Sequence, residues 1–214
     1  MILSEHESKE LLRSYGVPTV AEALARDENE AVVRACELGF PVAVKLCARG
    51  LAHKTERDLV RLDLADEAAV RAAAGDLWAR RETTDENPAL LVQRMVRGRR
   101  ELILGLLRDR QFGPCVMLGL GGILAEAIRD VVFRAAPVSA LDAAEMIEDL
   151  KAVHLLDAFR GEPVVDRDSL GRALTALGRI GLEQPDVASI DVNPMIVAGA
   201  EPVAVDALVE RSDA

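Results

Sequence analysis

A lysine lies inside the apolar run PVAVKL, residues 41–46, where its charge needs an explanation. The length of this run and its valines predict a buried strand, so Lys45 lies on a strand or at its end. A buried ammonium costs several kcal/mol unless an anion compensates it, so Lys45 requires a negative partner. The alternative is an edge strand, on which the lysine stem packs and its head reaches water.

The segment ARGLAHKT, residues 48–55, follows this strand and collects groups that suit a polyphosphate. Gly50 allows the backbone to approach a phosphate closely, and Arg49 and Lys54 add positive charge. His53 offers a nucleophilic imidazole. On spacing alone, however, His53 is more often an ordinary loop histidine, so the pattern favours phosphate binding without assigning a catalytic role.

Three oxygen donors lie near the C-terminus, at or beside the ends of two predicted strands, VASIDV (187–192) and PVAVDA (202–207). Asp191, Asn193 and Asp206 are hard ligands of the kind that hold Mg²⁺ against phosphate oxygens. Alternate positions on a strand share a face, so Asp191 and Asn193 can converge. The other interpretation is a turn at Asn193 and Pro194, with Asp191 on the solvent face.

A glycine-dense corner, GLGG at residues 119–122, lies between apolar segments. It is consistent with a loop near a ligand or with a plain tight turn. The chain contains neither the six-residue dinucleotide fingerprint nor GxxxxGK[ST], so neither a Rossmann site nor a P-loop is supported. A nucleotide site here requires some other fold.

Composition narrows the class of protein. The 214 residues are 50% hydrophobic, enough for one domain or two small lobes, and the net charge is -10. This charge argues against nucleic acid as a partner, and the arginine run at residues 94–100 is explained by a solvated face. The three cysteines, Cys36, Cys47 and Cys115, are far apart in apolar surroundings, which argues against disulfides or a zinc site.

No basic-then-apolar leader opens the sequence, and no run approaches the roughly 18 apolar residues that span a bilayer. We therefore expect no membrane partner and a cytoplasmic location.

The elements that must position these residues follow from periodicity and caps. Ser4 and Glu7 form a capping-box pattern for a helix that ends before Gly16, and a second helix spans residues 30–38. Residues 59–64 alternate like a strand, and Asp66 can cap the next helix. The turn-rich TTDENP, residues 83–88, is the clearest break, so we place a lobe boundary near Gln93 and divide the chain into residues 1–92 and 93–214.

The second half begins with strands. Residues 101–107 and 114–118 read as strands, and GLGG interrupts the latter. Asp142 with Glu145 starts another helix, and Leu170, Leu174 and Leu177 mark one face of a helix that ends before Pro185.

Taken together, the segments resemble one family, the ATP-grasp β subunit or β-type domain of ADP-forming acetate–CoA ligases, relatives of succinyl-CoA synthetase. The resemblance covers nearly the whole chain. It is carried, in order, by LSEHESKELLRSYGVPT, GFPVAVKL, HKT, LLVQRMVRGRRELILG, FGPCVMLGLGGILAEAIRDVVFRAAPVS and SIDVNPMIVAGAEPVAVDA. It implies an α+β ATP-grasp fold of two lobes, with the nucleotide cleft between them.

The resemblance also implies roles for single residues. Lys45 contacts the phosphates of ATP, and Asn193 and Asp206 ligate Mg²⁺, with Asp191 and Glu126 as supporting carboxylates. His53 matches a relay histidine that ATP phosphorylates before an acyl phosphate and acyl-CoA form. The nucleotide-binding set is completed by the residues of the expected adenine pocket and phosphate loop, namely Arg49, Gly50, Gln93, Arg94, Met95, Val96 and Glu101.

The family's CoA and acyl sites belong to an α subunit or α-type domains, which this sequence does not contain. The resemblance therefore implies a ligase that works with an α-type partner and uses ATP or ADP with Mg²⁺.

One segment departs from the family pattern. After the histidine the family resembles HKSD-x-GGV, whereas this chain reads HKTERDLV, with Asp58 and Leu59 in place of two glycines. A carboxylate there is expected to repel a polyphosphate by roughly 1 kcal/mol or more. The alternative function is thus a non-catalytic nucleotide-binding or assembly subunit with a degenerate phosphate loop. A third candidate is an ATP-grasp ligase that joins a free carboxylate to an amine, although HKT and FGPCVMLGLGG argue against it.

Overall fold

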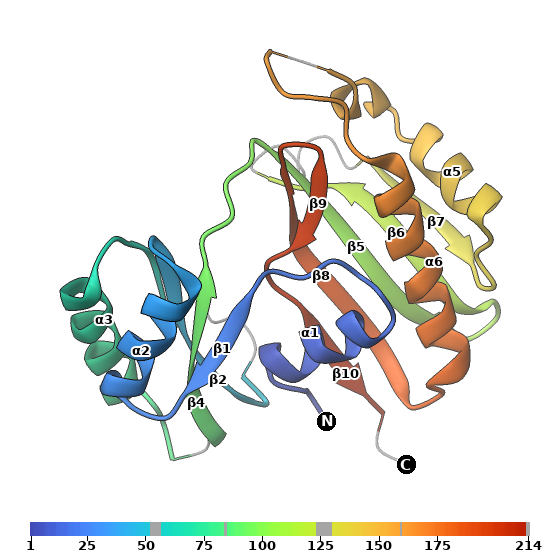
Figure 1. Cartoon of the computed structure of the whole chain (residues 1–214). Coiled ribbons are helices and arrows are strands. Elements are labelled where there is room, and N and C mark those ends of the chain that lie inside the picture. The colour runs from blue at the N-terminus through green and yellow to red at the C-terminus, as the bar shows by residue number, and fades with distance from the viewer. Residues whose placement is uncertain (52–56, 84, 123–129, 159, 213–214) are drawn as a thin grey trace. The chain divides into compact units, whose positions relative to one another are not determined.

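The structure is a computed structural model, and it describes residues 1–51, 57–83, 85–122, 130–158 and 160–212 (Figure 1). Its contacts divide the chain into two compact units. The small-sheet unit comprises residues 2–7 and 20–95, and the large-sheet unit comprises residues 1, 8–19 and 96–214. Helix α1 (Glu5–Ser14) contributes residues to both units. The predicted domain boundary between residues 92 and 93 stays a prediction.

The small-sheet unit is built on an antiparallel sheet with the strand order β1-β4-β2-β3. Helices α2 (Glu28–Leu38) and α3 (Glu67–Ala79) pack against it, and each is capped by an aspartate, Asp27 or Asp66, that accepts a backbone N–H. The strands are β1 (Glu22–Ala25), β2 (Val42–Arg49), β3 (Val60–Leu64) and β4 (Glu86–Arg94).

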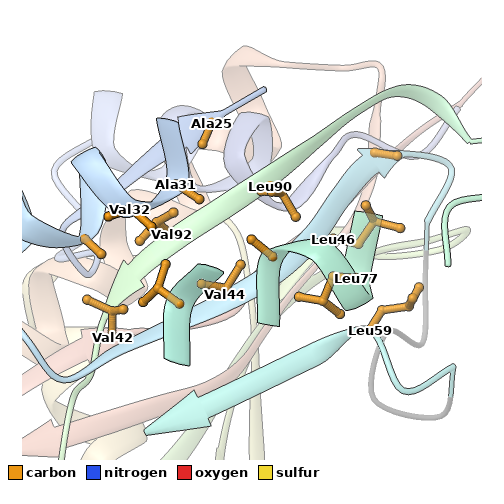
Figure 2. Packing of buried hydrophobic residues seen from close by; sticks show 14 of the residues in the cluster. Ala25, Ala31, Val32, Val42, Val44, Leu46, Leu59, Leu77, Leu90 and Val92 are labelled. Atoms are coloured by element: carbon orange, nitrogen blue, oxygen red, sulfur yellow. The ribbon is translucent and has the colours of Figure 1, made fainter. Parts of the chain in front are cut away.

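One face of this sheet forms the core of the unit (Figure 2). Val42, Val44 and Leu46 alternate along β2 and are fully buried, together with side chains from α2, α3 and β4. Each such side chain contributes roughly 1.5–3 kcal/mol when it leaves water. The opposite residues of β2, including Lys45, therefore lie on the other face.

The large-sheet unit carries a sheet with the order β10-β8-β5-β6-β7, and β9 pairs with β8. Helix α6 (Arg167–Glu183) packs on β5 and β6, and α5 (Ala140–Glu148) packs on α6 and β7. The strands are β5 (Arg100–Asp109), β6 (Gly113–Leu120), β7 (Val131–Ala135), β8 (Val187–Ala198), β9 (Glu201–Ala204) and β10 (Leu208–Arg211), and a short 3₁₀ helix, η1, spans Val153–Leu156. Leu102, Leu104 and Leu106 are buried on the face that meets α6.

Most predicted elements are confirmed. The capping box of α1 is present, since the Ser4 amide donates to Glu7 Oε2 (2.9 Å) and the Glu7 amide donates to Ser4 Oγ (3.3 Å). The strands around Lys45 and after Asp58, and the helix with Leu170, Leu174 and Leu177, also lie where periodicity places them.

Three local predictions are wrong. Strand β4 begins at Glu86, inside the segment predicted as a break. Gly119 and Leu120 continue β6, so GLGG is not wholly a corner. Helix α5 is capped by Ser139, and Asp142 is its third residue, which completes a capping box.

The predicted turn at Asn193 and Pro194 is also wrong, because β8 runs through both residues. The register of β8 against β5 shifts between Leu102 and Leu104, so one extra residue of β8 is accommodated in a bulge. Pro194 has no N–H to donate to a ladder, and a bulge is a place where a strand tolerates that.

Candidate functional site

The small sheet gathers polar side chains on the face opposite α2 and α3, here called the polar face. Lys45 and Arg49 alternate with the core residues of β2. Gln93 of β4 pairs with Ala43 of β2 and with Glu22 of β1, so Gln93 and Glu22 lie on the same face as Lys45. The polar face thus comprises Glu22, Lys45, Arg49 and Gln93.

Lys45 is buried on this face and has a protein anion beside it. β2 is an interior strand between β4 and β3, so the edge-strand interpretation is wrong. The lysine is 5% exposed, and its Nζ donates to Glu5 Oε1 at 2.6 Å, where Glu5 is itself 3% exposed. The predicted need for a negative partner is met by Glu5, in the first turn of α1.

Arg49 is paired in the same way at the end of β2. Its Nε donates to Glu7 at 2.8 Å and 3.1 Å, and its Nη2 donates to the same carboxylate. The Arg49 hydrogen bond is the main reason that the pKa of Glu7 falls from 4.5 to about 2, and Ser4 lowers it further. The positive charge predicted for phosphate binding is therefore already balanced in part by the protein.

Two more bonds fasten residues 2–7 to this sheet. His6 Nδ1 lies 3.0 Å from Glu22 Oε1, and the Gly50 amide donates to the Ile2 carbonyl at 3.1 Å. Gly50 has a positive φ of 74°, which explains the glycine as the residue that turns the chain after β2. Because its N–H is bonded to Ile2, Gly50 cannot use that N–H for a phosphate without losing this bond.

The predicted adenine-pocket segment divides between strand and linker. Gln93 is 5% exposed on the polar face, whereas Arg94 is exposed. The amides of Arg94 and Met95 donate to the carbonyls of Ala21 and Pro41. Val96 begins the last stretch of the large-sheet unit, residues 96–214. The assignment of these residues to adenine binding stays a prediction.

Asp58 and Leu59 occupy the position where the family pattern has two glycines. Asp58 has a φ of 55°, a conformation that favours glycine but that aspartate tolerates. Its carboxylate pairs with Arg61 at 2.9 Å and with Arg80 at 2.9 Å. Leu59 is 1% exposed and belongs to the core of the small-sheet unit. The charge of Asp58 is thus compensated locally, and Leu59 is a packing residue.

In the large-sheet unit, the predicted metal ligands lie on the face opposite α6, here called the acidic face. Asp191 pairs with Gly105, whose neighbours Leu104 and Leu106 point to α6. Asp191 and Asn193 are exposed on either side of buried Val192. The structure therefore places both predicted ligands of β8 on one face.

Asp206 reaches the same neighbourhood from the connection between β9 and β10. Leu208 pairs with Asp191, and the Val205 amide donates to the Pro194 carbonyl at 3.2 Å, which brings Asp206 beside Asn193. Asp191 presents surface to water, yet the surrounding protein is sufficient to raise the pKa of its carboxyl. The negative charge of Asp206 raises that pKa further.

These donors suit a hard divalent cation. The two carboxylates carry like charges that repel each other, and Mg²⁺ binding would relieve this repulsion. Together with the amide oxygen of Asn193 they form a set of hard oxygen donors. Over the described ranges no group of three or more His, Cys, Asp and Glu side chains could hold a metal ion. The predicted set contains only two such residues and Asn193, so the metal assignment stays a prediction.

Glu101 lies on the acidic face too, because it alternates with Ile103 and Gly105 along β5. Its carbonyl accepts the Gly121 amide at 2.7 Å. A Cβ at Gly121 would lie 3.1 Å from two Glu101 atoms, so this glycine permits a close approach of the chain to itself. That packing explains Gly121 without a ligand.

The comparison with known families decides what kind of protein carries these two faces. A family model described as an ATP-grasp domain matches residues 1–210. The chain belongs to the ATP-grasp family. The predicted ATP-grasp fold, with mixed helices and sheets, is confirmed.

Within the ATP-grasp family, the chain belongs with the β subunits of ADP-forming acetate–CoA ligases. It is 38% identical over 208 residues to the acetate–CoA ligase [ADP-forming] I subunit beta of Pyrococcus furiosus, covering 96% of this chain and 90% of that one.

Two solved structures of acetyl-coenzyme A synthetase 1 from Ca. Korarchaeum cryptofilum are also similar. One, in complex with coenzyme A, Ca-AMPCP and HgCl+, has a TM-score of 0.91 at 41% identity, covering 99% of this chain and 93% of that one. The other holds coenzyme A and Mg-AMPPCP, with its phosphohistidine segment pointing towards the nucleotide-binding site. Its TM-score is 0.84 at 41% identity, covering 97% and 92% of the two chains.

Sequence reasoning about this ATP-grasp chain missed Glu5 and Glu7 as partners of the predicted cations. The only signal was the acidic first turn of α1, which is also typical of any helix N-terminus. Predicted residues His53, Lys54 and Glu126 lie outside the described residues. No helix in the described part of the chain is long and apolar enough to cross a membrane.

Proposed function

We propose that this chain is the ATP-handling β subunit of an ADP-forming acyl-CoA synthetase. It transfers a phosphoryl group between ATP or ADP and a histidine relay that is coupled to acyl-CoA ligation. The observation that carries the proposal is Lys45, a buried cation held by Glu5 on the polar face of an ATP-grasp chain. A structural lysine has little reason to be buried with its charge, because two buried charges cost desolvation that an apolar pair avoids.

The roles of the polar-face residues follow from charge and chemistry. Lys45 donates to phosphate oxygens and offsets the charge that develops on the γ-phosphoryl group. Arg49 adds a second cation, moderated by Glu7. A ring nitrogen of His53 attacks the γ-phosphorus, the bond to the bridging oxygen breaks, and ADP leaves with the electron pair.

Asp191, Asn193 and Asp206 would hold Mg²⁺ through their oxygens. When bound, the ion supplies positive charge to the phosphate oxygens of ATP. In the unliganded chain Asp206 acts on Asp191 as a like charge, an interaction that a divalent cation would relieve more than a monovalent one.

The activity requires a partner with an α-type CoA and acyl site. The similar Pyrococcus furiosus protein is named as a beta subunit, and the Korarchaeum cryptofilum structures contain coenzyme A. A complete ligation therefore needs a hetero-oligomer with an α-type chain. The cytoplasmic location stays a prediction from sequence.

The alternative, a non-catalytic subunit with a degenerate phosphate loop, rested on Asp58 and Leu59. Arg61 and Arg80 compensate the charge of Asp58, which weakens the electrostatic argument for it. Leu59 is a core residue, so replacing it by glycine removes about 2–5 kcal/mol of packing rather than restoring a loop. The alternative is kept as an outcome of the labelling experiment below.

Nucleotide binding is tested first. ATP with Mg²⁺ at about 100 times its dissociation constant should stabilise the folded chain by about 2.7 kcal/mol, measured by thermal unfolding and calorimetry. Lys45→Ala should weaken ATP more than adenosine, because its contact is to phosphate. Absence of both a thermal shift and binding heat in the unmodified chain would reject the proposal.

Phosphoryl transfer is tested with γ-labelled ATP, with and without an α-type partner. Acid-labile label on the unmodified chain that is absent from His53→Asn identifies His53 as the acceptor. A chain that binds ATP but takes no label in either condition is the non-catalytic subunit.

A further inference from the structure

Glu5 contacts the proposed phosphate-binding lysine, and no role is yet assigned to it. Its carboxylate side chain is 1% exposed and lies 2.6 Å from Lys45 Nζ, whose side chain is 7% exposed. We propose that Glu5 is a positioning residue for nucleotide binding, one that fixes where the Lys45 ammonium lies before ATP arrives. This inference rests on the proposed function, because it assumes that Lys45 meets a phosphate.

The position of Glu5 is itself fixed by the residues around it. Ile2, His6 and Glu7 are bonded to Gly50, Glu22 and Arg49 of the same unit. Ser4 and Glu7 close the capping box that starts α1. A carboxylate on a capped helix turn that three bonds fasten to the rest of the unit has little freedom to follow a moving lysine, so it sets where the lysine head lies.

The chemistry of an ammonium also allows Lys45 to keep Glu5 while it meets a phosphate. An ammonium carries three N–H donors, so a bond to a carboxylate oxygen and a bond to a phosphate oxygen are compatible. A lysine that is already ordered loses less side-chain entropy on binding than one that is free in solution. Glu5 therefore favours triphosphate binding through preorganisation, although its own charge repels phosphate.

Preorganisation of Lys45 by Glu5 strengthens triphosphate binding, whereas the charge of Glu5 weakens it. The burial of Lys45 decides which effect is larger. Lys45 is 5% exposed, so without the Glu5 bond its head has to be placed again among buried groups each time a phosphate binds. We therefore expect the loss of Glu5 to weaken binding rather than to relieve repulsion.

The experiment compares binding of ATP with Mg²⁺ and of adenosine by calorimetry. Glu5→Gln should weaken ATP by about tenfold to a hundredfold, the equivalent of losing one hydrogen bond to a charged group, and should leave adenosine within about twofold. In a Lys45→Met background the same Glu5→Gln change should have no further effect, because it acts through Lys45. Glu5→Asp, which retains the charge, should recover part of the ATP affinity.

Loss of stability is controlled separately. Val70→Ala removes core packing on the other face of the same sheet, and it should lower stability while ATP and adenosine binding stay at wild-type strength in the folded protein. Binding is measured at a temperature where urea titration shows every variant folded. If Glu5→Gln does not fold, the comparison is made with Glu5→Asp, whose lower ATP affinity at unchanged adenosine affinity supports the proposal.

Equal or stronger ATP binding by Glu5→Gln overturns the positioning role, as does an equal loss for ATP and adenosine. A loss that persists in the Lys45→Met background also overturns it. An unmodified chain that binds no ATP rejects the proposed function and this inference together. An unmodified chain that binds ATP as tightly as Glu5→Gln does rejects this inference alone.

Discussion

On the polar face of the small sheet each predicted phosphate-binding cation has a carboxylate beside it, whereas on the acidic face of the large sheet two carboxylates lie beside each other. Lys45 pairs with Glu5, and Arg49 pairs with Glu7. Asp206, by contrast, raises the pKa of Asp191. Each predicted cation of the first face thus lies beside an opposite charge, whereas Asp206 acts on Asp191 as a like charge.

This difference separates two ways of arranging charged side chains before a ligand binds. A buried cation must have a protein anion, since an unpaired buried charge destabilises the folded protein before any ligand binds. Partly exposed carboxylates can remain together because water screens them, and a divalent cation then gains from both. Mutations on the polar face should therefore change folding stability most, and those on the acidic face should change ligand binding most.

The largest expected effect is on the polar face. Lys45→Met leaves Glu5 as a buried carboxylate without its lysine, and the free energy of unfolding should fall by about 3 kcal/mol. Glu5→Gln with Lys45→Met should regain most of that loss, because no buried charge of the pair remains. Urea unfolding of the two single variants and the double variant measures the coupling. A Lys45→Met chain as stable as the unmodified one would show that the pair is not a buried ion pair in solution.

The next-largest effect is on the acidic face, where a substitution should change ligand binding rather than folding stability. Mg-ADP at about 100 times its dissociation constant should add about 2.7 kcal/mol to the unmodified chain. Asp206→Asn keeps the size of the side chain but removes a charged ligand, so it should lose most of this gain while the unliganded protein loses no stability. Thermal unfolding with and without nucleotide and Mg²⁺ measures both quantities. A full Mg-ADP gain in Asp206→Asn would reject Asp206 as a ligand.

The sequence predicts those parts of this contrast that depend on a residue and its neighbours along the chain, and it misses those that depend on the tertiary fold. The strand around Lys45 and the charge it must find were predicted, since hydrophobic pattern and desolvation act on the residue itself. Glu5 was not, because its 40-residue separation from Lys45 is closed only by the tertiary fold. Asp191 and Asn193 were placed on one face by strand alternation, whereas the turn predicted at Pro194 became a bulge, because pairing with β5 outweighs the local turn preference.

A smaller effect concerns the second pair of the polar face. The pKa of Glu7 is about 2 in the folded chain, below its ordinary 4.5, so the stability contributed by its pair with Arg49 is fully present above pH 4.5. It is lost as the pH falls from 4.5 towards 2. Both side chains are about one-third exposed or more, so screening limits this contribution to about 1 kcal/mol.

Glu7→Gln should therefore lower the unfolding free energy at neutral pH and flatten its dependence on pH between 4.5 and 2. Urea unfolding at several pH values, with Glu10→Gln on the exposed side of the same helix as the control, measures this change. An unchanged slope in Glu7→Gln would indicate that solvent has already screened the pair.

The smallest effect has the opposite sign and belongs to the acidic face. The folded pKa of Asp191 is raised by partial desolvation and by Asp206, so the stability linked to its protonated form is present below pH 3.8 and is lost as the pH rises through the folded pKa. At neutral pH the ionised Asp191 therefore lowers stability.

Asp191→Asn should raise the unfolding free energy of the unliganded chain by a few tenths of a kcal/mol at pH 7, since water screens the carboxylate. The gain should vanish at low pH and should be smaller in an Asp206→Asn background, where part of the cause is already removed. A loss of stability at pH 7 instead would show that Asp191 is engaged by a group that stabilises its charge, and the contrast between the two faces would not hold.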